Sequence, residues 1–191
     1  YFDVTPDLAC YGKAMGNGMP VAALVGRRAL MEDAAVLISG TMSGNTLGLA
    51  AAKAVLDLYA RDPVIERLWR VGGKFQDGLR EIIGAEGIPA VVEGYAVHPR
   101  LRFLDDPHHR QMSLFLQEAV ARGVLLHPSG WNSSWAHTDE DVEQSLDACE
   151  SALCVVRDGL EAGDLAARLH GAPMEPSLIR ISDAGHGGRN G

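Results

Sequence analysis

The sequence is poor in cysteine. Three cysteines occur in 191 residues, Cys10, Cys149 and Cys154, and they form neither an even disulfide framework nor a Cys-x-x-Cys pair. This argues against a small secreted domain held together by disulfides. A reducing, cytoplasmic compartment is the better expectation.

The sequence also lacks long hydrophobic runs and an excess of positive charge. No apolar run approaches the roughly twenty residues of a membrane span, and no basic region precedes a hydrophobic one at the N-terminus. The formal net charge is −8, and Lys and Arg do not cluster beyond Arg27 and Arg28. We therefore expect no nucleic acid and no membrane as main partner, but small molecules or other proteins.

Metal-ligand spacing is missing as well. His108 and His109 are adjacent, so their rings cannot easily point at one ion, and no acidic or cysteine residue stands at ligand spacing from them. We expect a surface pair and no metal site.

What is present is an ordinary globular composition, 47% hydrophobic and 22% charged, with helical and strand-like patterns in alternation. The fold class expected is α/β. A buried strand is predicted at 21–25, and further strands are predicted at 36–38, 90–94, 97–104, 124–127 and near 133–135. Helices are predicted at 29–35, at 45–60, from Pro63 to the glycines at 84 and 87, before Gly123, and after Thr138.

One lysine stands in a glycine-rich stretch. Lys13 lies between Gly12 and the pair Gly16 and Gly18, just before the strand-like segment 21–25. Glycine has no Cβ, so backbone and a cofactor can approach closely there. The alternative is an ordinary solvated loop lysine, and the stretch alone does not decide between them.

A second motif changes that balance. Gly40 to Asn45 (GTMSGN) is small and rich in hydroxyl groups, and it runs directly into a helical pattern. Free N–H groups and the positive end of the dipole at a helix start favour an anion such as phosphate. A lysine amine for a Schiff base, with Thr41 and its neighbours to hold phosphate, is the combination that a pyridoxal 5′-phosphate (PLP) enzyme needs.

These motifs resemble those of the fold-type I, class III aminotransferases. Pro6-Asp7-Leu8 followed by Gly12 to Pro20 (GKAMGNGMP) is similar to the lysine motif of that family, and Gly40 to Asn45 is similar to its phosphate loop. Residues 113–136, and then His137-Thr138 before an acidic helix, resemble the C-terminal domain of the branch that contains glutamate-1-semialdehyde aminomutase. The resemblance covers about residues 3–176.

The resemblance implies a domain organisation and a set of partners. Residues 1–85 would end the PLP-binding large domain, residues 86–170 would form the small C-terminal α/β domain, and residues 171–191 would be a flexible tail. Lys13 would be the catalytic residue and would bind the cofactor together with Gly40 and Thr41. In this family the phosphate loop reaches across a dimer interface, so a homodimer acting on an amine donor and a carbonyl acceptor is implied.

The resemblance also implies a gap. The family's Asp for the pyridinium nitrogen and its stacking aromatic residue lie upstream of the lysine, and the chain opens on Tyr1-Phe2-Asp3 without an initiator Met. We therefore expect a fragment that is catalytically incompetent alone unless a longer chain or a companion supplies the rest. A non-enzymatic binding or assembly subunit is the alternative, and lysine-dependent lyase or decarboxylase chemistry on the same scaffold also stays open.

Substrate choice is indicated only by the segment 127–135. It has no Arg to bind a carboxylate bidentately, but it contains Asn132 between aromatic residues. The amide of Asn132 would suit a hydroxylated or sugar-like carbonyl substrate. Trp131 and Trp135 have a simpler alternative role, which is to pack the small domain.

Overall fold

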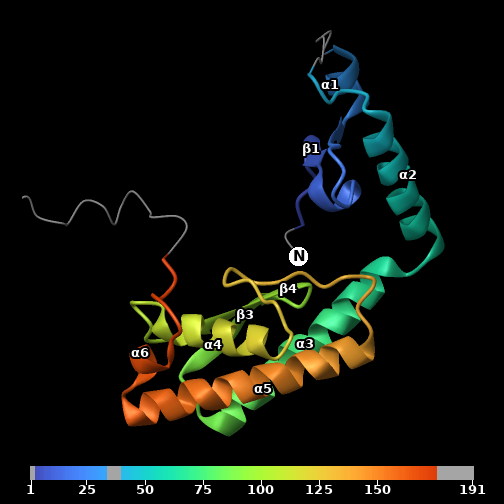
Figure 1. Cartoon of the computed structure of the whole chain (residues 1–191). Coiled ribbons are helices and arrows are strands. Elements are labelled where there is room, and N and C mark those ends of the chain that lie inside the picture. Colours follow the sequence, from blue (N-terminus) through green and yellow to red (C-terminus); the bar gives the residue numbers. More distant parts are fainter. Residues whose placement is uncertain (1–2, 34–39, 176–191) are drawn as a thin grey trace, which may run out of the picture. The chain divides into compact units, whose positions relative to one another are not determined.

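The computed structural model describes residues 3–33 and 40–175 and divides the chain after Ile65 into two compact units (Figure 1). Within those ranges, no helix combines the length and the apolar character that a membrane crossing requires.

The first unit is a hairpin with two helices. Its elements are β1 (Leu8–Tyr11), the short 3-10 helix η1 (Lys13–Met15), β2 (Ala23–Gly26), α1 (Arg28–Asp33) and α2 (Thr46–Arg61). The strands pair antiparallel, with Leu8 opposite Gly26 and Tyr11 opposite Ala23. At the open end the Arg27 amide donates to the Asp7 carbonyl (3.0 Å), and the two side chains form an ion pair (2.6 Å).

The helices predicted at 29–35 and 45–60 are confirmed over the described residues, but the burial predicted for the strand at 21–25 is wrong. Leu24 and Val25 of β2 are 42% and 45% exposed. A lone two-stranded hairpin has no second layer to cover its apolar faces. The strand predicted at 36–38 lies outside the described residues.

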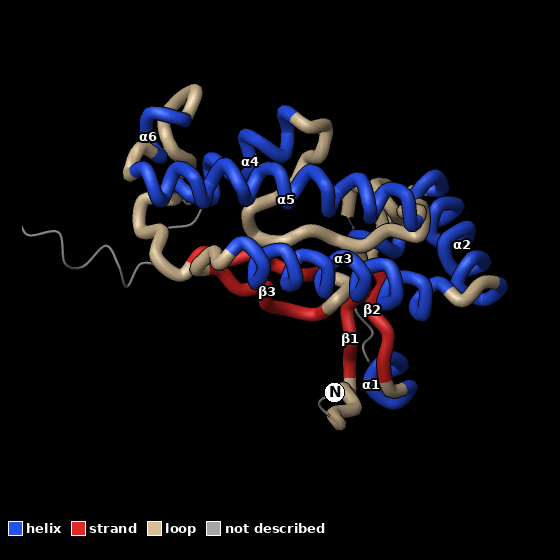
Figure 2. Tube along the Cα trace, turned by 90° about the horizontal axis from the view of Figure 1, so that it is seen from below, coloured by secondary structure: helices blue, strands red, loops and turns tan. Residues whose placement is uncertain are grey.

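The second unit contains a larger core. Its elements are α3 (Val64–Glu86, which begins at the division), β3 (Ala90–Tyr95), β4 (His98–Phe103), α4 (Arg110–Ala121), α5 (Asp139–Ala162) and α6 (Leu165–Arg168). Figure 2 shows α3 and α5 running along one another beside the β3–β4 hairpin of the same unit. The ion pairs Arg70–Asp139 (2.8 Å) and Lys74–Glu143 (2.7 Å) join the two helices.

The core of this unit follows the helical and strand periods. Leu79 of α3, Leu114 of α4 and Leu153 of α5 have no exposed surface, and alternate residues of β4, Leu101 and Phe103, are buried. The end of α3 lies at Gly87 (φ +64°), which adopts the left-handed conformation, whereas Gly84 is an ordinary helical residue.

The N-terminus of α5 is a capping box. The Thr138 hydroxyl accepts from the Asp141 amide (3.1 Å), and the Asp141 carboxylate accepts from the Thr138 amide (2.8 Å). The acidic start predicted for this helix is therefore confirmed.

The strands predicted at 124–127 and near 133–135 are wrong. Both segments are loops, and Leu125 is 86% exposed. The second segment approaches the β3–β4 turn through two backbone hydrogen bonds, Trp131 N to Pro99 O (3.2 Å) and Ser133 N to Val97 O (3.1 Å). Two isolated bonds anchor a loop but do not make a ladder, and a strand needs a ladder.

The packing assigns α3 to the second unit, although the sequence places a domain boundary at residue 85. The bounds 1–85 and 86–170 stay predictions. The start of the expected flexible tail is packed: the Met174 amide donates to Ser113 Oγ (2.9 Å), and Met174 contacts the core. Residues 176–191 of that tail lie outside the described residues.

Two neighbouring glycines of α3 predict opposite effects on stability. A Cβ on the buried Gly72 would overlap the Ala96 carbonyl and Ser133 Oγ, whereas a Cβ on Gly73 would meet nothing within 4 Å. Gly72→Ala is expected to destabilise by about 1–3 kcal/mol through overpacking. Gly73→Ala, the matched control, is expected to stabilise by about 0.5–1 kcal/mol through helix propensity. Urea unfolding measures the free energy of unfolding of both variants. Equal changes in that free energy would contradict the packing of the β3–β4 turn, at Ala96, against Gly72 of α3.

The capping box predicts acid sensitivity. Hydrogen bonds from the Thr138 amide and then its hydroxyl lower the pKa of Asp141 below 3.8. Such a group stabilises the fold above its unfolded pKa, and this contribution is lost as pH falls through the folded pKa. Asp141→Asn should therefore be less stable than the wild type at pH 7, with a difference that shrinks below about pH 4.

Urea unfolding over a pH series is the measurement. Asp147→Asn is the control, because it removes a carboxylate of the same helix that has no hydrogen-bond partner among the described residues. A difference for Asp141→Asn that does not vary with pH would show that the box does not act through ionised Asp141.

Candidate functional site

Lys13 occupies a strained turn. It follows β1, begins η1, and has φ +50°, the left-handed conformation that side chains other than glycine rarely adopt. The Lys13 carbonyl accepts from the amides of Gly16 and Asn17 (both 3.1 Å), which fix this backbone. Strain of about 1–3 kcal/mol in such conformations concentrates at functional sites.

Among the described residues, the amine of Lys13 has no partner. The chain has three lysines. Lys53 pairs with Asp57 (2.6 Å) and Lys74 pairs with Glu143 (2.7 Å), whereas the exposed Lys13 amine has no ion pair or hydrogen bond within the described ranges. The hydrogen bond to Glu143 also raises the pKa of Lys74, so that amine stays protonated. Lys13 is thus the lysine best placed to act as a nucleophile.

Glycines allow tight packing around the lysine turn. A Cβ on the buried Gly16 would overlap the Met19 carbonyl and the Val21 side chain. A Cβ on Gly48 of α2 would lie 2.7 Å from the Pro20 carbonyl oxygen. These glycines let backbone pack against backbone, and this packing seats α2 against the end of the lysine loop. The close approach of a cofactor stays a prediction.

The predicted phosphate loop is a turn that α2 continues. The Ser43 amide donates to the Gly40 carbonyl (2.9 Å), and Asn45 caps α2 by accepting from the Gly48 amide at Oδ1 (2.9 Å). Gly40 and Thr41 are exposed. The N–H groups of the first helical turn that lack internal acceptors face this end of the helix.

A hollow of about 590 Å³ lies beside this turn. Its lining combines the end of the lysine loop with the phosphate loop and the first turns of α2, namely Pro20, Val21, Ala22, Gly40, Met42, Ser43, Gly44, Asn45 and Leu49. It brings Gly40 next to the lysine loop, but neither Lys13 nor Thr41 is part of the lining. The Lys13 amine and the predicted phosphate loop therefore do not line one common hollow.

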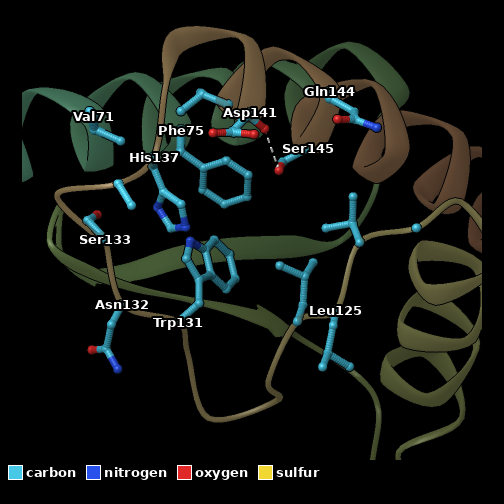
Figure 3. A pocket seen from close by; sticks show the side chains of 15 residues that line it. Val71, Phe75, Leu125, Trp131, Asn132, Ser133, His137, Asp141, Gln144 and Ser145 are labelled. Atoms are coloured by element: carbon cyan, nitrogen blue, oxygen red, sulfur yellow. Dashed lines mark hydrogen bonds between the residues drawn. The ribbon is translucent and has the colours of Figure 1, made fainter. Parts of the chain in front are cut away.

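Asn132 belongs to the second unit, on the loop between α4 and α5. Its Oδ1 lies 2.9 Å from His98 Nδ1, and the side chain is exposed. Figure 3 shows the neighbouring Trp131 directed at Phe75, and the Asn132 amide on the other side of the loop. His98 stands 34 residues away in sequence, and no motif or spacing signals this contact.

The rings of this loop pack the second unit. Trp131 makes an edge-to-face contact with Phe75 (4.6 Å between centroids), and Arg67 lies over the Trp135 ring (5.0 Å). Trp131 lines a cavity of about 530 Å³ together with residues of α3, α5 and the same loop (Figure 3). Packing, the simpler role considered for Trp131 and Trp135, is the one observed here.

Comparison with known proteins identifies the family. The family model Aminotransferase class-III matches residues 1–153. The glutamate-1-semialdehyde 2,1-aminomutase of Thermomicrobium roseum is 37% identical over 175 residues, which cover 83% of this chain and 41% of that protein. The enzyme of the same name from Thermus thermophilus is 34% identical over 166 residues, 78% of this chain and 39% of that protein.

Solved structures agree. The FumI protein of Sphingopyxis sp. MTA144, solved in a PLP form, superposes with a TM-score of 0.78 at 29% identity over 83% of this chain and 39% of that one. An omega-transaminase from Sphaerobacter thermophilus shares the fold, with a TM-score of 0.71 at 23% identity over 81% of this chain and 40% of that one. The predicted fold class is confirmed.

The chain spans about 40% of the length of these relatives. The matched residues include both the lysine motif and the phosphate loop, and the PLP cofactor predicted from those motifs is confirmed for the family. The chain belongs to the class-III aminotransferases, a family of PLP-dependent enzymes.

Proposed function

We propose that the protein transfers an amino group, as a PLP-dependent aminotransferase or aminomutase, and that Lys13 is the residue that binds the cofactor covalently. One observation carries this assignment. The lysine at the family's motif is also the lysine whose amine has no partner in the part of the chain that the structure describes, and it sits on a strained turn.

Bound PLP supplies an aldehyde carbon for an amine and a ring that withdraws electrons from the substrate Cα. Lys13 would hold PLP through its amine and would be freed when a substrate amine takes its place. The freed Lys13 Nζ would then act as the general base that removes the proton from the substrate Cα and as the general acid that delivers a proton to the rearranged product. The rigid backbone of the turn keeps Nζ within reach for both steps.

Gly40 and Thr41 are proposed to hold the phosphate group of the PLP that is bound to the partner subunit of a homodimer. The Thr41 hydroxyl and the amides at the start of α2 are the donors. Two observations support a second copy: the hollow beside Gly40 does not include Lys13, and apolar residues of the first unit, such as Leu24 and Leu47, are exposed. The chain then contributes to two active sites.

The proposed reactants are an amine donor and a hydroxylated or sugar-like carbonyl acceptor. Asn132 offers an amide for a hydroxyl or carbonyl oxygen, and the segment 127–135 has no Arg for a carboxylate. The aminomutase name of the relatives describes those proteins.

A second candidate role is a binding or assembly subunit without activity of its own. The labelling experiment below separates the two roles.

A reducing cytoplasm is the proposed location. All three cysteines are free thiols, and Cys10 is exposed. Burial raises the pKa of the Cys149 thiol to about 12, so that residue is inert. Exposed free thiols persist where glutathione keeps them reduced.

Covalent trapping tests the role of Lys13. PLP added to the protein and reduced with borohydride should leave a phosphopyridoxyl group on the peptide that contains Lys13, as found by mass spectrometry. Lys13→Ala should abolish this label, whereas Lys53→Ala and Lys74→Ala should keep it, because their amines are paired with Asp57 and Glu143.

Equal labelling of all three lysines would reduce Lys13 to an ordinary loop residue, and the enzymatic proposal would fail. If the label reaches Lys13 only when upstream sequence or a companion chain is present, the isolated 191 residues fit the role of an incomplete subunit.

Asn45 separates helix capping from phosphate binding. Asn45→Asp keeps an oxygen for the Gly48 amide and favours the helix dipole, so stability should hold or rise by up to about 1 kcal/mol. The added negative charge beside Gly40 should nevertheless weaken PLP binding by about tenfold or more. Asn45→Ala, the control, should lose about 1 kcal/mol of stability without adding charge.

Fluorescence titration with PLP and thermal unfolding give the two readouts. Unchanged PLP affinity in Asn45→Asp would place the phosphate elsewhere.

A further inference from the structure

His98 and Asn132 meet at the end of the β3–β4 hairpin. His98 is the first residue of β4, and its Nδ1 lies 2.9 Å from Asn132 Oδ1 and 3.1 Å from the Trp131 carbonyl oxygen. One ring nitrogen therefore faces two atoms of the same loop.

The Trp131 carbonyl decides where the histidine hydrogen lies. A carbonyl oxygen only accepts hydrogen bonds, so the nitrogen that faces it at 3.1 Å must carry the hydrogen. That N–H is shared with the side chain of Asn132, which must then also present an acceptor, its Oδ1. The opposite orientation of the Asn132 amide, with Oδ1 outward, is disfavoured, because it would place the Asn132 NH₂ donor against the His98 N–H donor.

The loop keeps both side chains in place. Gly130 has φ +110°, and a Cβ there would lie 2.8 Å from the Pro99 carbonyl oxygen and 3.2 Å from His98 Cε1, so the imidazole ring lies against bare backbone. The hydrogen bonds from Trp131 N to Pro99 O and from Ser133 N to Val97 O hold the loop on either side of Asn132. The orientation of the amide is therefore fixed before any ligand arrives.

We propose that His98 is a positioning residue, which holds Asn132 through Nδ1–H so that the Asn132 NH₂ group faces outward as a hydrogen-bond donor. The protein thereby favours a substrate with an uncharged oxygen acceptor, a carbonyl or hydroxyl, at this point. The substrate half of this inference rests on the proposed function, whereas the positioning half is a property of the chain alone.

The tautomer can be measured without cofactor or substrate. Long-range ¹H–¹⁵N correlation spectra of the protein above about pH 8, where an ordinary histidine is neutral, distinguish a protonated Nδ1 from a protonated Nε2. His98 should be the Nδ1–H form, with its signals assigned by their loss in His98→Gln.

Two other histidines are internal controls. His127 Nδ1 accepts from the Ser129 amide (3.1 Å) and His137 Nδ1 accepts from the Ser134 amide (3.2 Å), so both should be the Nε2–H form. A His98 signal of the same Nε2–H form would overturn the positioning role, whatever the function of the protein.

Kinetics of the PLP-loaded protein, with upstream sequence if trapping at Lys13 requires it, test the substrate half. Asn132→Asp keeps an oxygen for His98 but replaces the outward NH₂ with an oxygen, so KM for the carbonyl substrate should rise about tenfold with kcat little changed. His98→Ala should raise KM too, and His98→Gln, which can still donate to Asn132 Oδ1, should recover most of the loss.

An unchanged KM in Asn132→Asp, with His98 confirmed as Nδ1–H, would overturn the substrate half alone. A failure of Lys13 trapping would count against the proposed function and leave the result for His98 standing.

Discussion

The structure of the second unit depends on the apolar face of α3. Val71, Phe75, Leu79 and Ile83 repeat every four residues and are all buried, so they form a continuous seam along the helix. The β3–β4 hairpin and α5 contact this helix. The ion pairs Arg70–Asp139 and Lys74–Glu143 fix α5 alongside it. Trp131 closes on Phe75 from the loop side. The loop that carries Asn132 is therefore held by the same helix that forms the core.

The first unit differs from the second in what its apolar residues contact. Its hairpin and α2 carry large apolar side chains that remain exposed, while its polar features make defined local contacts: the Asp7–Arg27 ion pair, the Lys13 turn and the Asn45 cap. The turn and the helix start are held by local hydrogen bonds, whereas large apolar side chains around them, such as Leu24 and Leu47, remain exposed.

The candidate site was predictable where its signals are local. Lys13 between glycines, and Gly40 to Asn45 at a helix start, are fixed by neighbouring residues, and the structure gives both the close packing and the cap that such sequences require. His98 was not predictable, because its contact with Asn132 spans 34 residues and depends on a loop that two backbone bonds hold against the hairpin turn. The same loop explains the wrong strands at 124–127 and 133–135: alternation and apolar content predict a strand, but only a neighbouring edge creates one.

The sequence by itself determined the longer helices, the capping box of α5, the β3–β4 hairpin and the family motifs, because helix periodicity, capping residues and glycine placement act within a few residues. Tertiary structure alone decided which apolar segments are covered, that α3 joins the second unit, that Lys13 is the lysine without a partner among the described residues, and that the Asn132 amide faces His98. Those outcomes depend on distances between residues far apart in the chain. Such distances are set only when the cores pack.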